Sequence, residues 1–100
     1  MDDAEIMAQV RAGDKTACGL CIERHSPAVY RFALRLTGDE REAEDVVQET
    51  FLSAFKHIDS FEARSGIATW LYRITLNLVM AHRRIDHPEL SIEEVADEDS

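Results

Sequence analysis

The sequence predicts an all-α fold, a compact bundle of about four to five helices without a sheet. Three observations point to this class. Apolar residues recur at three- and four-residue spacing in each long segment. Residues that cap helices, an acid or a serine at the start and a glycine at the end, separate these segments. No stretch alternates convincingly between polar and apolar residues, as a half-buried strand would.

The first predicted helix begins at Asp2 or Asp3 and reaches about Ala12. Gly13 then ends it, because glycine readily adopts the left-handed conformation that often follows a helix C-terminus. The apolar stripe of this helix consists of Ile6, Met7 and Val10.

A second predicted helix is capped by Asp14 and runs to about His25. The pair Ser26-Pro27 is typical of an N-cap followed by proline at the first helical position, so we expect a break or kink there. A third helical segment then runs from this proline to Thr37, and Gly38 ends it.

The next predicted helix opens at Asp39, which has a glutamate three residues later in the spacing of a capping box, and runs to about His57. Residues 59–66 are predicted to form a loop, and the last long helix extends from about Ile67 to about Ile85. The positions expected to face the core in these two helices are Val46, Val47, Thr50, Phe51, Ala54, Phe55, Trp70, Leu71, Ile74, Leu78 and Ala81.

Length and composition exclude several classes of protein. The chain has 100 residues, 11 basic and 20 acidic, which gives a net charge of −9 and room for one domain. No apolar run approaches the roughly 18–20 residues that cross a membrane, and the acidic N-terminus is unlike a signal peptide. We therefore expect a cytoplasmic protein without membrane insertion. Its net acidity argues against indiscriminate binding to a phosphate backbone.

The charges are unevenly distributed along the chain. Residues 39–49 contain six carboxylates and one base, whereas residues 63–85 contain four arginines and no acid. Residues 86–100 contain seven carboxylates and neither lysine nor arginine, and we expect an acidic tail there, with at most one short helix from Ser91. This division suggests two partners of different character, although solvated helix faces would produce the same pattern.

Two cysteines form a lone C-x-x-C, Cys18 and Cys21, with His25 nearby. Zinc needs about four ligands, and a fourth is not apparent. At this spacing on a helix, core packing is the favoured interpretation. The sequence also contains no nucleophile, phosphate-loop or dinucleotide motif. We therefore expect no enzymatic activity, no cofactor and no metal.

One predicted helix carries a polar ridge on its exposed side. Asp45, Gln48 and Glu49 lie at positions i, i+3 and i+4, and Val46 and Phe51 lie behind them toward the core. Such a rigid row of carboxylate and amide groups suits a basic helical partner.

The last long helix carries the opposite chemistry. Past its first turn, the residues expected to share the solvent-facing side are Arg73, Asn77, Met80, Arg83 and Arg84. Arginines there suit phosphate groups, and an amide suits a base edge. The preceding loop offers an aromatic ring and polar groups, Phe61, Arg64 and Ser65, that could hold an extruded base.

These motifs resemble region two of bacterial sigma factors, most of all the extracytoplasmic-function (ECF) type. The resemblance rests on Asp-Val-Val-Gln-Glu-Thr-Phe at 45–51, on Thr-Trp-Leu-Tyr-Arg-Ile at 69–74 and on Asn77, and it covers about residues 7–85. It implies an all-α bundle over residues 1–85. It also implies a transcription initiation factor, not an enzyme, that carries RNA polymerase core to promoters and opens the −10 element.

The resemblance also implies roles for individual residues. The positions implied to bind a coiled coil of the polymerase β′ subunit are Glu44, Asp45, Gln48 and Glu49. The positions implied to bind the non-template strand of the −10 element are Phe61, Arg64, Ser65, Thr69, Arg73, Asn77, Arg83 and Arg84. Trp70 has two interpretations, promoter-facing or core, and we favour the core. An anti-sigma factor is a further partner that the resemblance allows.

This sequence departs from its relatives at three places. Cys18 and Cys21 stand where relatives tend to have Phe and Leu. The loop at 61–67 reads FEARSGI, where relatives often have Phe-x-Gly-Glu-Ser-Ser-Phe. We expect the domain that reads the −35 element to be absent from this chain, and residues 86–100 resemble the start of the linker to it. Two alternatives stay open: an interaction module that binds polymerase but has lost DNA recognition, and a metal or thiol sensor built on Cys18, Cys21 and His25.

Overall fold

Four α-helices and one short 3₁₀-helix make up the part of the chain that the computed structural model describes, residues 1–61 and 66–86. In chain order they are α1 (Asp3–Arg11), α2 (Lys15–Thr37), α3 (Glu40–Lys56), η1 (Ile58–Ser60) and α4 (Ile67–Asp86). No strand occurs within these described ranges. The predicted all-α class is therefore confirmed, whereas the expected acidic tail with its short helix lies outside the described residues.

The predicted helix caps are present. The side chains of Asp2, Asp14 and Asp39 each accept a hydrogen bond from a backbone N–H of the first turn of α1, α2 and α3 respectively. The donor–acceptor distances are 2.9 Å from Glu5 N to Asp2, 2.8 Å from Thr16 N to Asp14 and 3.0 Å from Glu42 N to Asp39. Gly38 ends α2 in the left-handed conformation, with φ +72°, and its N–H donates to the Leu34 carbonyl.

The predicted break at Ser26-Pro27 is wrong, because α2 continues from Lys15 to Thr37 with Pro27 inside it. Proline removes the N–H that would bond the carbonyl of Glu23, four residues earlier. Glu23 and Pro27 are both exposed, so water can solvate the freed carbonyl. On the opposite side, Cys21 and Val29 are each 1% exposed and pack in the core. Tertiary packing on both sides of the proline therefore outweighs its local preference to end a helix.

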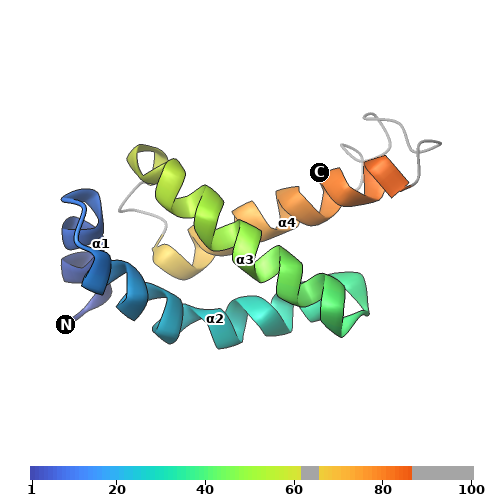
Figure 1. Ribbon diagram of the computed structural model, residues 1–100, viewed down its shortest axis with the longest axis horizontal. Coiled ribbons are helices and arrows are strands. Elements are labelled where there is room, and N and C mark those ends of the chain that lie inside the picture. The colour runs from blue at the N-terminus through green and yellow to red at the C-terminus, as the bar shows by residue number, and fades with distance from the viewer. Residues whose placement is uncertain (62–65, 87–100) are drawn as a thin grey trace.

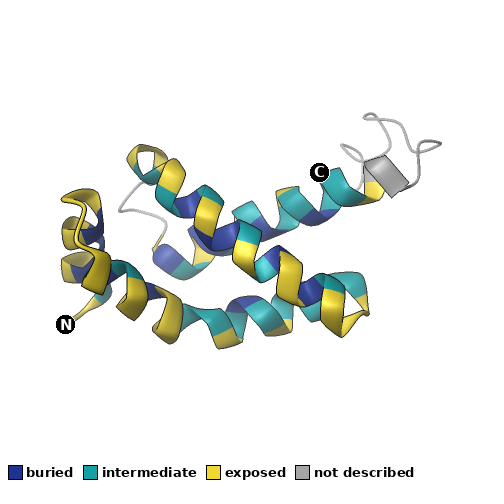
Figure 2. Ribbon diagram, viewed as in Figure 1, coloured by how far each residue is buried: buried dark blue, intermediate teal, exposed yellow. Residues whose placement is uncertain are grey.

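The three long helices pack on one another, and α1 closes one end. Each of α2, α3 and α4 contacts the other two, and α1 packs against α2 and η1 (Figure 1). Buried residues lie where these helices face one another, and exposed residues cover their outer sides (Figure 2). Within residues 1–61 and 66–86, no helix combines the length and the apolar character needed to cross a membrane.

The inward face of α4 differs from the predicted one. Leu78 is half-buried, whereas Thr75 and Val79 are almost fully buried. The hydroxyl oxygens of Thr50 on α3 and Thr75 on α4 lie 3.1 Å apart, and each hydroxyl is within hydrogen-bond distance of the carbonyl four residues earlier. Threonine can therefore occupy the α3–α4 contact without an unpaired polar atom.

Candidate functional site

The polar residues predicted on α3 lie at its surface. Glu44, Asp45 and Gln48 are exposed, whereas Ala43 and Val46 on the other side of the helix are fully buried. Glu49 differs from the prediction because it is only half-exposed. We call Glu44, Asp45, Gln48 and Glu49 the α3 ridge.

Two hollows lie between α2 and α3 beside the ridge, and both are lined by Val47 and Gln48. The other residues of the more polar hollow are Ser26, Pro27, Tyr30 and Glu44. The other residues of the apolar hollow are Ile22, Phe51, Leu52 and Phe55. Burial raises the pKa of Tyr30, and the carboxylates of Glu40 and Glu44 raise it further. The ridge therefore borders two hollows of different character, one more polar and one apolar.

Glu49 is bonded to the neighbouring helix. Its Oε2 lies 2.9 Å from Nε2 of His82 on α4, and the two residues are 33 positions apart in sequence. The ridge on α3 and the helix α4 are thus joined by a direct polar contact.

The outer side of α4 carries the predicted polar residues. Thr69, Arg73, Asn77 and Arg83 are exposed, and Met80 is half-buried. The first three follow one another at four-residue spacing, which places them on one side of the helix. Arg84 lies in α4, but its side chain is outside what the structure describes, and Arg64 and Ser65 lie outside the described residues.

Arg83 has a structural contact that the sequence did not predict. Its guanidinium donates a hydrogen bond to the carbonyl of Leu36, in the last turn of α2. Carbonyls in that turn have no partner within the helix, so the contact satisfies one of them. Arginine has five N–H donors, which leaves others for a phosphate.

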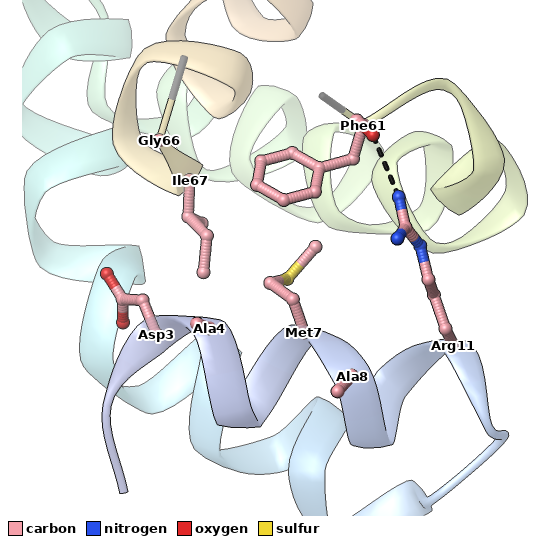
Figure 3. Close-up of a pocket in the computed structure, with 8 residues that line it drawn as sticks. All are labelled: Asp3, Ala4, Met7, Ala8, Arg11, Phe61, Gly66 and Ile67. Atoms are coloured by element: carbon pink, nitrogen blue, oxygen red, sulfur yellow. Dashed lines mark hydrogen bonds between the residues drawn. The ribbon is translucent and has the colours of Figure 1, made fainter. Parts of the chain in front are cut away.

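Phe61 lies between η1 and α4 and contacts two elements. Its ring centroid is 5.0 Å from that of Trp70, and the Arg11 guanidinium lies over the ring, 5.8 Å from the centroid. Arg11 also donates a 2.8 Å hydrogen bond to the Phe61 carbonyl. A cavity of about 290 Å³ lies here between α1, Phe61 and the start of α4 (Figure 3). Its lining is mainly apolar and includes Met7 and Ile67.

Trp70 is a core residue, as the favoured interpretation predicted. It is 7% exposed and belongs to the main hydrophobic cluster with Leu71 and Phe51. Its indole ring is therefore not presented on the outer side of α4.

The cysteines lie in the α1–α2 contact. Cys21 is 1% exposed and Cys18 is half-buried, and both pack in the main cluster. The polar partner of His25 is the carboxylate of Asp3 on α1, which lies 3.2 Å from its Nε2. In the described part of the chain, no group of three or more potential ligands is placed to hold a metal ion. These contacts support the interpretation of the cysteines as core residues.

We expect Cys21 to react far more slowly with iodoacetamide than an ordinary cysteine. Burial raises the pKa of Cys21 to about 11, and the charges of Asp3 and Cys18 add to the shift. Because the thiolate is the nucleophile, a rise of about two pKa units lowers its population at neutral pH roughly a hundredfold. Mass spectrometry after timed alkylation of the native and the urea-unfolded chain measures this. Equal rates in both states would instead indicate an accessible thiol of the kind a sensor needs.

Arg11 and His82 are site residues that the sequence reasoning missed. Each contacts a predicted site residue across a long separation in sequence, 50 positions for Arg11 to Phe61 and 33 for His82 to Glu49. The one available signal was that each is a titratable side chain within a predicted helix. That signal identifies no partner.

Comparison with known proteins identifies the family. The family model described as Sigma-70 region 2 matches residues 21–86. The ECF RNA polymerase sigma factor SigW of Bacillus subtilis is 37% identical over 81 residues, which cover 81% of this chain and 43% of that protein. The RNA polymerase sigma-H factor of Pseudomonas aeruginosa is 34% identical over 80 residues, covering 80% of this chain and 42% of that protein.

A third relative gives the same picture. The ECF RNA polymerase sigma-E factor of Haemophilus influenzae is 36% identical over 77 residues, which cover 77% of this chain and 40% of that protein. The chain thus spans less than half the length of these three relatives. The resemblance drawn from residues 45–51 and 69–77 is confirmed, and the chain belongs to the Sigma-70 region 2 family.

Proposed function

We propose that this chain acts in transcription initiation, binding RNA polymerase core through the α3 ridge and the −10 element through α4. The observation that carries the proposal is that two neighbouring helices expose side chains of opposite charge. α3 exposes carboxylates and an amide, and α4 exposes arginines and an amide. Both faces lie over buried stripes that fix their orientation.

The α3 ridge suits a basic helical partner, which we propose is the coiled coil of the polymerase β′ subunit. Glu44, Asp45 and Gln48 are exposed on a helix whose other side is fully buried, so they can bind without refolding. The apolar hollow beside them contains Leu52, which is 71% exposed. Acidic groups next to an exposed apolar side chain suit an amphipathic helix with basic residues along its edge.

The outer side of α4 suits single-stranded DNA. Arg73 offers a cation for a phosphate, and Asn77, one turn further, offers an amide for a base edge. The cavity beside Phe61 is close to the lower limit of the roughly 300–1,000 Å³ range of small-molecule pockets, and its lining is mainly apolar. An extruded base of the non-template strand fits that chemistry. Recognition and opening of the −10 element are then binding events, and the chain acts without catalysis, in the compartment that holds the polymerase.

We expect Arg73→Ala and Asn77→Ala to weaken DNA binding in different ways. Arg73→Ala removes a phosphate contact, so it should weaken binding to all DNA sequences about equally. It should also lower the slope of log K against log salt concentration by about 0.7 for a single strand. Asn77→Ala removes the amide, so it should change the preferred base and leave that slope nearly unchanged. Polymerase core reconstituted with each variant, titrated with single-stranded −10 oligonucleotides at several salt concentrations, measures both quantities.

The matched control is Lys15→Ala, which removes an exposed cation at the start of α2. It should change neither the slope nor the base preference. If the chain binds polymerase core but the reconstituted complex shows no −10 selectivity, the chain is an interaction module without DNA recognition. A changed base preference for Arg73→Ala at constant slope would show that the roles on α4 are assigned wrongly.

A further inference from the structure

We propose that His82 is a positioning residue for polymerase docking, which holds the Glu49 carboxylate in the orientation that the partner binds. The proposal rests on the proposed function, because it assumes that the α3 ridge docks on the β′ coiled coil. Its basis is the contact between Nε2 of His82 and Oε2 of Glu49, at 2.9 Å. This contact joins α4 to α3 and is not a neighbour pair within one helix.

Glu49 differs from the rest of the α3 ridge in having a partner. Among the residues that the structure describes, His82 is the one basic side chain within 4.0 Å of the Glu49 carboxylate. Neither Asp45 nor Glu44 has such a partner within residues 1–61 and 66–83. Glutamate loses considerable rotamer freedom when a partner immobilises it, and that loss lowers affinity. A carboxylate already held in the free protein avoids part of this cost.

The contact leaves Glu49 available for docking. Its side chain is 45% exposed, and His82 uses one of the two carboxylate oxygens. A carboxylate offers about four lone-pair sites, so Oε1 and the remaining lone pair of Oε2 can accept from a basic partner. The arrangement therefore orients the group without occupying it.

His82 is itself well placed to hold another side chain. Its side chain is 29% exposed, which limits its motion. The next residue, Arg83, donates to the Leu36 carbonyl at the end of α2 and so fastens this part of α4 to a second helix. The imidazole thus bonds to α3 from a part of α4 that Arg83 joins to α2. The helix proposed to face DNA also carries the residue that orients the docking carboxylate.

The test is a double-mutant cycle on the 100-residue chain, with affinity for a β′ coiled-coil fragment as the readout. We expect His82→Ala to weaken binding by about two- to tenfold, the range for ordering one flexible side chain. The same substitution in a Glu49→Ala background should have no further effect, because the group that it positions is gone. His82→Gln, whose amide can donate to Glu49, should recover most of the affinity.

The matched control is His25→Ala, which removes another interhelical histidine–carboxylate contact, to Asp3. It should leave the affinity unchanged once both variants are shown by circular dichroism to be folded. If His25→Ala and His82→Ala lower the affinity equally, His82 has only a structural role and the proposal is overturned. The same follows if His82→Ala has an equal effect on affinity with and without Glu49. Tighter binding of His82→Ala would show that His82 masks Glu49, which also overturns it.

The two proposals fail in different ways. If Glu49→Ala weakens docking and His82→Ala does not, the ridge stands as the docking site and the positioning role is wrong. If neither Glu49→Ala nor any other ridge substitution changes the affinity, the proposed docking site is wrong and the positioning role is overturned with it.

Discussion

Asp45→Lys is expected to weaken binding to RNA polymerase core by about 2–5 kcal/mol, which corresponds to roughly 30-fold to several thousand-fold in Kd. Asp45 is exposed in the middle of the α3 ridge, between Glu44 and Gln48. Lysine at this position removes an acceptor and places a positive charge against the basic partner that we propose. Like charges at an interface cost several kcal/mol and also slow association, so both rate constants should change.

The substitution should leave the fold intact. Surface changes away from caps and core usually alter stability by about 0.5 kcal/mol or less. Binding kinetics on immobilised core, together with urea unfolding of the same samples, separate docking from folding. Glu5→Lys on α1 is the matched charge reversal, since Glu5 is an exposed acid outside the ridge. Equal affinities for both variants would exclude the α3 ridge as the docking surface.

The helix boundaries could be predicted because their signals are local. A cap at Asp14 or Asp39 is a contact within three residues, and a left-handed glycine such as Gly38 needs no distant partner. The outer positions of α3 and α4, such as Gln48 and Asn77, follow equally from the helical repeat. One such local signal was wrong at Pro27, where packing of the neighbouring turns decides the outcome.

The polar contacts between different helices could not be predicted. Glu49–His82 and Leu36–Arg83 span 33 and 47 positions, and they depend on the angles at which the helices cross. Periodicity places Glu49 on the outer side of α3, but it cannot show that α4 approaches closely enough to bond its carboxylate. The same holds for Arg11, whose contact with Phe61 depends on where α1 lies relative to η1.

Trp70→Ala is expected to lower the free energy of unfolding by about 3–5 kcal/mol, the range for truncating a large buried aromatic residue. Trp70 is 7% exposed and belongs to the cluster that joins α1, α2, α3 and α4. Its truncation removes apolar contacts and also the aromatic contact with Phe61, at 5.0 Å between ring centroids. A domain of this size is typically stable by about 5–15 kcal/mol, so much of that margin would be lost.

Urea unfolding followed by circular dichroism measures the loss, and Trp70→Phe provides a milder variant that keeps an aromatic ring beside Phe61. The control is Leu52→Ala, which also truncates a large apolar side chain but at a position that is 71% exposed, so its effect should be about 0.5 kcal/mol or less. Trp70→Phe, which keeps a ring beside Phe61, should bind −10 oligonucleotides as the unsubstituted chain does, because the indole lies in the core and not on the outer side of α4. A stable Trp70→Phe variant that has lost −10 selectivity would mean that the indole itself contacts the promoter, and the core assignment would be wrong.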